Sequence, residues 1–152
     1  MRLTSIAPGE QGTRETLRMM AGLAREASRD SRFIEFANLF QSAADVHASL
    51  SGVYKYQDEE IETLYAPTFN LNYFNQTGEL TGDCDDIAMF YAAIFRVLGL
   101  PTRFVAMKTK RHDPEFLHVV VESFEDGRWR RYDPTVQPGL VQIDFGRMVE
   151  YV

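Results

Sequence analysis

The stretch Gly82-Asp83-Cys84-Asp85-Asp86, followed by the apolar run from Ile87 to Leu98, decides the fold of this chain. Eleven of the twelve residues in that run are apolar or aromatic, and only Arg96 is charged. A helix that is apolar on nearly every face is buried on nearly every face. Gly82 and Asp83 are typical of a helix start, and Gly99 is typical of a helix end. We therefore expect the protein to pack around a central helix with Cys84 in its first turn.

Cys84 is the only cysteine of the chain. At a helix start, unpaired N–H groups and the positive end of the helix dipole favour the nucleophilic thiolate, and they can also receive an oxyanion. The neighbouring Asp83, Asp85 and Asp86 act in the opposite direction, because like charges raise the pKa of a thiol. A catalytic Cys84 therefore needs a nearby cation such as an imidazolium. The alternative is a buried structural cysteine.

The composition predicts one globular domain over residues 1–152, with 45% hydrophobic and 25% charged residues. A net charge of −6 argues against nucleic acid or an anionic membrane as a partner. One cysteine excludes an intrachain disulfide and a cysteine-based zinc site, and no metal or cofactor is expected. Because no apolar run approaches the roughly 20 residues of a membrane span and the first residues lack the pattern of a signal peptide, the sequence predicts a cytoplasmic protein.

Helices are expected in the first half of the chain and strands in the second, an order typical of the α+β class. In the first half, the expected elements are a loose lead-in over 1–12, a helix over 13–27, a second apolar stripe over 33–50, an extended piece over 53–56 and an ordered loop over 68–81. In the second half they are strands over 102–108, 117–124 and 129–133, a polar loop over 110–115 and one more strand or edge segment within 139–152.

A thiolate nucleophile needs a base, and the base needs a group that orients it. The chain has three histidines. His47 falls within the second apolar stripe, where a packing or surface role is favoured, and His112 falls in a charged loop, where a solvated side chain is favoured. His118 opens the valine-rich strand, where a polar ring requires an explanation. His118 is therefore the candidate base.

The dipeptide Asp126-Gly127 predicts a two-residue hairpin turn, which pairs residues whose numbers sum to 253. Glu122 then faces Arg131, a pair of opposite charges that supports this register. In the same register His118 and Asp133 become diagonal neighbours on one face, within reach of each other. A three-residue loop would place them on opposite faces. Taken alone, Asp133 would be a strand-end residue that leads into a turn at Pro134.

These stretches resemble the transglutaminase-like cysteine hydrolases, which have a papain-type fold. The matching segments are Gly82–Asp86, Leu98–Val105, His118–Glu122 and Gly127–Thr135, in the family's order of Cys, His and Asp. More weakly, Gly12–Met20, Tyr56–Asp58 and Glu62–Pro67 resemble small transglutaminase-like proteins of bacteriophages and prophages. The resemblance implies a catalytic core over about 53–152, with Cys84 as nucleophile, His118 as general base and acid, and Asp133 as the orienting carboxylate.

The activity that this resemblance implies is acyl transfer on a peptide or protein amide. A hydrolytic peptidase or amidase is favoured. A cross-linking transglutaminase and a non-catalytic phage assembly or binding module, with phage structural proteins as partners, are the alternatives. The chain lacks the small residues and Trp that follow the cysteine of papain-like proteases, the paired CxxC motifs of peptide N-glycanases and identifiable calcium sites.

Two features of the predicted site remain open in the sequence. Candidates for the side chain that completes an oxyanion hole are Asn72, Asn75 and Gln76. Asp85 and Asp86 are expected to point away from the side of the helix that Cys84 occupies and to cap the helix or bind a cation such as Arg103. The competing interpretation is that one of these two carboxylates is a second orienting acid or a metal ligand.

Overall fold

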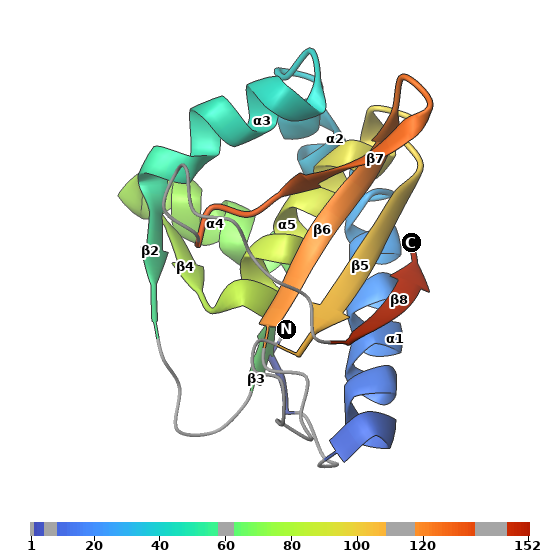
Figure 1. The fold of residues 1–152 in the computed structure, drawn as a ribbon. Helices are drawn as coiled ribbons and strands as arrows, with labels where there is room; N and C mark the ends of the chain where they lie inside the picture. Colours follow the sequence, from blue (N-terminus) through green and yellow to red (C-terminus); the bar gives the residue numbers. More distant parts are fainter. Residues whose placement is uncertain (1, 5–8, 58–62, 109–117, 136–145) are drawn as a thin grey trace.

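The computed structural model describes residues 2–4, 9–57, 63–108, 118–135 and 146–152 (Figure 1). Its helices are α1 (Gly9–Ala27), α2 (Ser31–Ala37), α3 (Ala43–Leu50), the short 3-10 helix η1 (Ser51–Val53), α4 (Pro67–Thr77) and α5 (Cys84–Val97). Its strands are β1 (Arg2–Thr4), β2 (Tyr54–Tyr56), β3 (Thr63–Tyr65), β4 (Leu80–Gly82), β5 (Thr102–Met107), β6 (His118–Glu125), β7 (Arg128–Tyr132) and β8 (Arg147–Tyr151).

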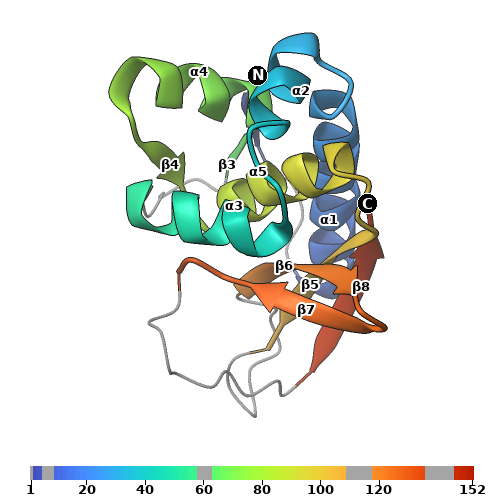
Figure 2. The ribbon, with the colours of Figure 1, turned by 90° about the horizontal axis from the view of Figure 1, so that it is seen from above.

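Helix α5 is the centre of the fold. Every residue of α5 from Asp85 to Phe95 is buried, and the helix contacts α1, α2 and α4 as well as strand β6. Figure 2 shows α5 between the other helices and the sheet. Asp83 caps the start of the helix, and Gly99 follows its end with a φ of 78°. The central buried helix expected from the sequence is confirmed.

A four-stranded antiparallel sheet in the order β7-β6-β5-β8 covers one side of α5. Its inner face adds apolar side chains to the main core, namely Phe104, Ala106, Val119, Val121 and Met148. Val105, Met107 and Val120 form a second buried cluster on the opposite face. Apolar residues therefore point to both faces of the central strands, which explains why the apolar residues of β5 and β6 do not strictly alternate with polar ones.

The hairpin between β6 and β7 has the two-residue turn expected from Asp126-Gly127. Both turn residues have positive φ, 53° and 80°, as a type I′ turn requires. Glu122 pairs with Arg131 and Glu125 with Arg128. The predicted register is confirmed, and it is this register that brings the start of β6 close to the end of β7.

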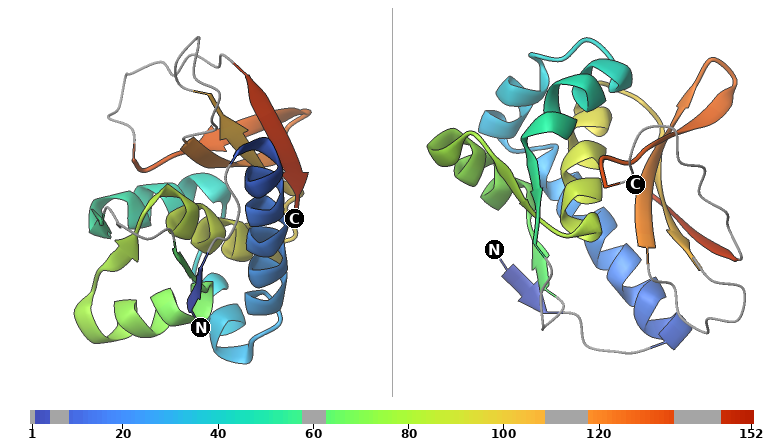
Figure 3. Two further views of the ribbon diagram at one scale, coloured as in Figure 1. Left: turned by 90° about the horizontal axis from the view of Figure 1, so that it is seen from below. Right: turned by 60° about the vertical axis from the view of Figure 1, so that its left-hand side comes forward.

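Two smaller sheets lie on the other side of α5. Strand β2 pairs in parallel with β4, with Tyr54 opposite Leu80 and Tyr56 opposite Gly82, and β1 pairs with β3. The right-hand view of Figure 3 shows β2 and β4 on one side of α5 and β6 on the other. Because β4 ends two residues before Cys84, this arrangement places β2 beside the start of the helix.

The expectation of an ordered loop over residues 68–81 was wrong, because α4 and β4 occupy this segment. Pro67 starts α4 at a position where proline is favoured, and Gly78 ends it with a φ of 75°. Beyond Pro67, only Asn70 and Leu71 are buried in α4. A helix that buries so few side chains leaves no clear apolar period in the sequence.

The remaining boundaries differ from the expected ones in smaller ways. The stripe over 33–50 forms two helices rather than one, because Ser42 accepts a hydrogen bond from the N–H of Asp45 and starts α3 anew. The expected lead-in contains β1 and the first turn of α1, whose start at Gly9 precedes the predicted one. The predicted strands are present as β2, β5, β6, β7 and β8. The polar loop predicted over 110–115 lies outside the described residues.

No helix in the described ranges has the length and apolar character of a membrane span.

Candidate active site

Cys84 is held at the first position of α5 by the turn that precedes it. The Asp83 side chain accepts hydrogen bonds from the N–H groups of Asp85 and Asp86, and Asp86 in return accepts one from the N–H of Asp83 at 3.0 Å. Gly82 approaches this capping box so closely that a Cβ on it would lie 2.3 Å from Oδ2 of Asp86. Its φ of 121° also favours glycine. The nucleophile candidate therefore lies on a rigid turn.

His118 and Asp133 are joined by a short hydrogen bond, with 2.6 Å between Nε2 and Oδ2. Their side chains are only 14% and 8% exposed. The other carboxylate oxygen of Asp133 accepts hydrogen bonds from the N–H and the hydroxyl of Thr135, at 2.9 and 2.6 Å. Burial by itself raises the pKa of Asp133, but the hydrogen bonds from His118 and Thr135 outweigh it and lower the pKa.

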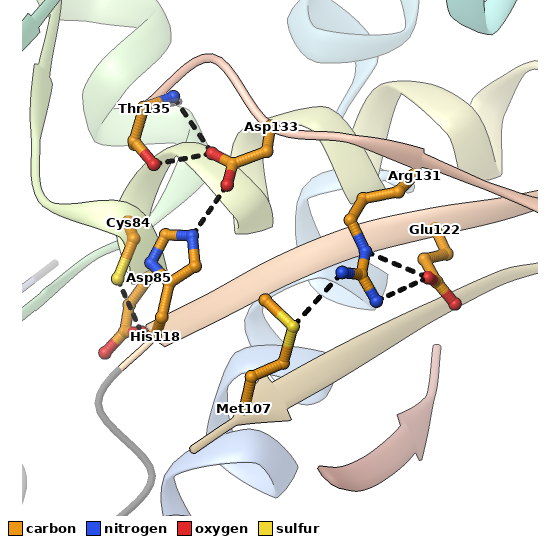
Figure 4. A network of polar contacts seen from close by, with 8 residues as sticks. All are labelled: Cys84, Asp85, Met107, His118, Glu122, Arg131, Asp133 and Thr135. Carbon is orange, nitrogen blue, oxygen red and sulfur yellow. Dashed lines mark hydrogen bonds and ion pairs between the residues drawn. The ribbon is translucent and has the colours of Figure 1, made fainter. Parts of the chain in front are cut away.

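An ionised Asp133 fixes the tautomer of His118. A carboxylate can only accept, so the shared proton is on Nε2, and in the neutral imidazole Nδ1 is then the free acceptor. Figure 4 shows the sulfur of Cys84 on the side of the ring opposite to Asp133. The site therefore presents a proton acceptor to the sulfur. That Sγ lies within about 4 Å of Nδ1, a distance suited to proton transfer, stays a prediction.

The start of β6 also contributes a backbone donor. The pairing of β7 ends at Tyr132 opposite Val121, so β7 does not use the N–H of Val119. That N–H hydrogen-bonds to the sulfur of Cys84 instead. A donor at the sulfur favours the thiolate, and it places the nucleophile next to the backbone of the candidate base.

The charges around Cys84 favour the neutral thiol. Burial raises the pKa of Cys84 well above its ordinary value, and the carboxylates of Asp85 and Asp83 raise it further, while the N–H of Val119 only partly offsets them. Asp85 does not point away from the cysteine, as the sequence had indicated; its Oδ1 lies 3.7 Å from Sγ, at a distance where the thiol donates to it. Burial and the neighbouring carboxylates together therefore favour the protonated thiol over the thiolate.

The sequence matches a known protein family. The profile of the transglutaminase-like superfamily matches residues 35–134, about two thirds of the sequence. The chain belongs to the transglutaminase-like superfamily. The matched range includes Cys84, His118 and Asp133.

Among solved structures, the chain is similar to a protein from Cytophaga hutchinsonii described as "a Putative Cysteine Protease". The two share 17% sequence identity with a TM-score of 0.45, over 89% of this chain and 46% of the other. The chain thus spans about half of the length of that relative. No curated protein matches the sequence. The α+β class expected from the sequence, with a transglutaminase-like core in which a Cys-bearing helix packs on a small antiparallel sheet, is confirmed.

In this transglutaminase-like domain, Asp86 is a structural carboxylate. It is fully buried, and besides the Asp83 N–H it accepts the N–H of Tyr65 at 2.6 Å, which ties β3 to the start of α5. Its expected capping role is confirmed. The proposed pairing with Arg103 is wrong: Arg103 binds Glu122 at 2.7 Å, and its guanidinium lies 4.2 Å from the ring centroid of Trp129.

The other expectations for the site differ in outcome. His47 packs against Tyr91 and Tyr132, with Nδ1 3.3 Å from the Tyr91 hydroxyl, which confirms a packing role. His112 lies outside the described residues. Asn72, Asn75 and Gln76, the expected oxyanion-hole candidates, are exposed on α4. Within the described ranges, no group of three or more His, Cys, Asp or Glu side chains is arranged to hold a metal ion.

Sequence reasoning did not identify Thr135 or Val119 as parts of the site. The signal for Thr135 was present, because an Asp side chain commonly accepts a hydrogen bond from the backbone N–H two residues further along the chain. The contact of the Val119 N–H with the sulfur has no sequence signal, since it depends on where β7 leaves β6.

The position of Asp85 predicts the pH dependence of Cys84 alkylation. We expect the rate of alkylation by iodoacetamide to be low at acid pH and to rise through the alkaline range, because the thiol of the resting protein is protonated and only the thiolate reacts. Asp85→Asn removes a negative charge beside the sulfur, which lowers the pKa of Cys84 and moves the profile towards acid. Asp126→Asn, at an exposed position in the hairpin turn, is the matched control. An unmoved profile in Asp85→Asn would contradict the contact.

The environment of Asp86 predicts a pH-dependent stability. Burial and then the charge of Asp83 raise its pKa from 3.8 to about 9, and a proton on Asp86 can be shared with Asp83. A pKa raised by folding gives a stabilising contribution that is complete below the unfolded pKa and is lost as the pH rises through the folded one. We therefore expect the advantage of the wild type over Asp86→Asn in free energy of unfolding to shrink between about pH 4 and pH 9. Urea titrations across this range measure it, and a constant difference would contradict the assignment.

Proposed function

We propose that this protein is a cysteine peptidase or amidase in which Cys84 attacks an amide carbonyl, His118 transfers the protons and Asp133 positions the imidazole. The contact of 2.6 Å between His118 and Asp133 carries the proposal, because it leaves Nδ1 as the acceptor on the side of the sulfur. Membership of the transglutaminase-like superfamily supports cysteine-dependent catalysis.

In the first half of the reaction, the proton of the Cys84 thiol passes to Nδ1 of His118 as the sulfur–carbon bond forms. Because the resting thiol is neutral, the imidazole acts as a general base during attack, and no ion pair needs to exist beforehand. The tetrahedral intermediate then collapses. The carbon–nitrogen bond breaks, Nδ1 gives its proton to the leaving amine, and a thioester on Cys84 remains.

In the second half, His118 takes a proton from water as the water attacks the thioester. The sulfur–carbon bond breaks, the carboxylic acid leaves, and the proton returns to the sulfur. Throughout both halves Asp133 stays ionised and stabilises the imidazolium, while Thr135 holds the carboxylate in place. We propose water as the acceptor; a lysine amine in its place would make the protein a cross-linking transglutaminase.

The upstream resemblance to phage and prophage proteins supports phage structural proteins as a class of substrate or partner. The chemistry of the proposed site requires only a peptide or protein amide. No cofactor enters any of the proposed steps. The same fold with an idle triad would be a binding module, which is the outcome that the next experiment separates from an enzyme.

The proposed function is tested with p-nitrophenyl acetate and a primary amine such as cadaverine. We expect the wild type to release nitrophenol beyond one equivalent per chain, with acetate as the second product whether or not the amine is present. Cys84→Ala should show no release above the rate in buffer. Acetylated cadaverine as the main product would assign amine transfer instead of hydrolysis. The absence of any acylation at Cys84 would overturn the enzyme assignment.

A further inference from the structure

Tyr54 is the first residue of β2, and its side chain is hydrogen-bonded to the turn that precedes the candidate nucleophile. Its hydroxyl donates to the carbonyl oxygen of Gly82 at 2.9 Å, two residues before Cys84. In the parallel pairing of β2 with β4, Tyr54 is opposite Leu80, so its side chain extends along β4 to reach Gly82. Figure 1 shows the two strands side by side where β4 leads into α5.

The Gly82 carbonyl does not depend on Tyr54 for a hydrogen bond. The N–H of Gln57 donates to the same oxygen, also at 2.9 Å. A carbonyl with two donors keeps one when the other turns away, so rotation of the hydroxyl leaves no buried acceptor unsatisfied. The proton of Tyr54 is therefore available to a new acceptor at small cost.

The hydroxyl also stays protonated. Burial raises the pKa of Tyr54 above its ordinary value, and the charges of Cys84 and Asp83 raise it further. A side chain that responds to the charge of Cys84 lies within electrostatic reach of it. Because the pKa moves upward, Tyr54 remains a neutral donor across the working pH range and does not compete for the proton of the thiol.

The backbone of the first turn of α5 offers a second donor. The Asp83 side chain takes the N–H groups of Asp85 and Asp86. Within the part of the chain that the structure describes, the N–H of Cys84 has no acceptor. An oxyanion that forms on the carbonyl attacked by Sγ would meet this N–H first, and a second donor strengthens such a site.

We propose that the Tyr54 hydroxyl is the side-chain donor of the oxyanion hole, acting together with the N–H of Cys84, an inference that rests on the proposed function of Cys84 as nucleophile. As the carbonyl oxygen gains charge, the hydroxyl turns from Gly82 to that oxygen. It turns back when the intermediate collapses. Tyr54 thus replaces the exposed amide side chains of α4, which the sequence offered as candidates for the oxyanion-hole donor.

Two reagents that react with the same sulfur test this assignment. Alkylation by iodoacetamide forms no oxyanion, whereas acylation by p-nitrophenyl acetate passes through one. We expect Tyr54→Phe to slow acylation by about 10²- to 10³-fold, the range for loss of one such donor. Its alkylation rate should stay within about 2-fold of the wild type, because the thiol itself is unchanged. Tyr56→Phe, two residues along the same strand and 55% exposed, is the matched control and should change neither rate.

The result that overturns the assignment is an equal effect of Tyr54→Phe on both reagents, or no effect on either. An equal loss would mean that the hydroxyl only supports the turn. A third arm separates this failure from that of the proposed function: if His118→Ala also leaves acylation unchanged, the proposed function and the oxyanion role both fail. If His118→Ala slows acylation and Tyr54→Phe does not, only the oxyanion role fails.

Discussion

Asp133→Asn is expected to lower the rate of Cys84 acylation by about 10³- to 10⁴-fold, although the two side chains have nearly the same shape. The reason lies in Thr135, whose N–H and hydroxyl both donate to one oxygen of residue 133. In the variant these donors hold the amide oxygen in that position, so the amide nitrogen faces His118. An N–H there donates to Nε2 and moves the imidazole proton to Nδ1. The imidazole then presents a proton to the sulfur and accepts none.

Single-turnover acylation with p-nitrophenyl acetate measures this loss. Asp126→Asn changes the same residue type at the exposed turn of the same hairpin and should leave the rate unchanged. Circular dichroism and thermal unfolding of Asp133→Asn would show an intact fold. A loss smaller than about 10-fold would mean that the amide turns its oxygen towards His118, and that Thr135 does not control the tautomer.

Gly82→Ala has the largest expected effect on stability, a decrease of roughly 2–4 kcal/mol in the free energy of unfolding. The added Cβ would lie 2.3 Å from Oδ2 of Asp86, and the φ of 121° is one that alanine rarely adopts. Relief would require Asp86 to move, which would break its hydrogen bonds to Asp83 and Tyr65. The turn before Cys84 and the link to β3 would therefore be lost together.

Gly22→Ala is the matched control for this substitution. Gly22 is exposed within α1, has nothing within 4 Å of an added Cβ and has an ordinary helical φ. There alanine should stabilise the protein by about 1 kcal/mol, because it has the higher helix propensity. Urea unfolding of both variants measures the contrast. Similar values for the two would contradict the close approach of Gly82 to Asp86.

The features that the sequence predicts best have strong local signals. The apolar run after Cys84 can only be buried in the core, so the sequence predicts the central helix α5. Asp126-Gly127 is typical of one common hairpin turn, so the sequence also predicts the register of β6 and β7. Because side chains alternate between the two faces of a strand, this register also places His118 and Asp133 on the same face, near each other. These elements make up most of the candidate site.

The features that the sequence does not predict depend on contacts between distant segments. Helix α4 buries few side chains and so leaves no apolar period. Asp85 was expected to point away from Cys84 because neighbours on a helix differ by about 100°. In the first turn, however, both side chains face the same buried region and lie in contact. The contact of Tyr54 with Gly82, on which its proposed role rests, depends on the pairing of β2 with β4, which no local pattern specifies.

The central claim is that His118 removes the proton of Cys84, and the rate of acyl-enzyme formation tests it most directly. Rapid mixing with p-nitrophenyl acetate, acid quenching and mass analysis of the Cys84 peptide give this rate for the wild type and for His118→Ala. We predict one acetyl group per chain on Cys84 and a rate about 10²- to 10⁴-fold lower in the variant. Added imidazole should restore part of that rate. Equal rates of Cys84 acetylation in the two proteins would contradict the proposed mechanism.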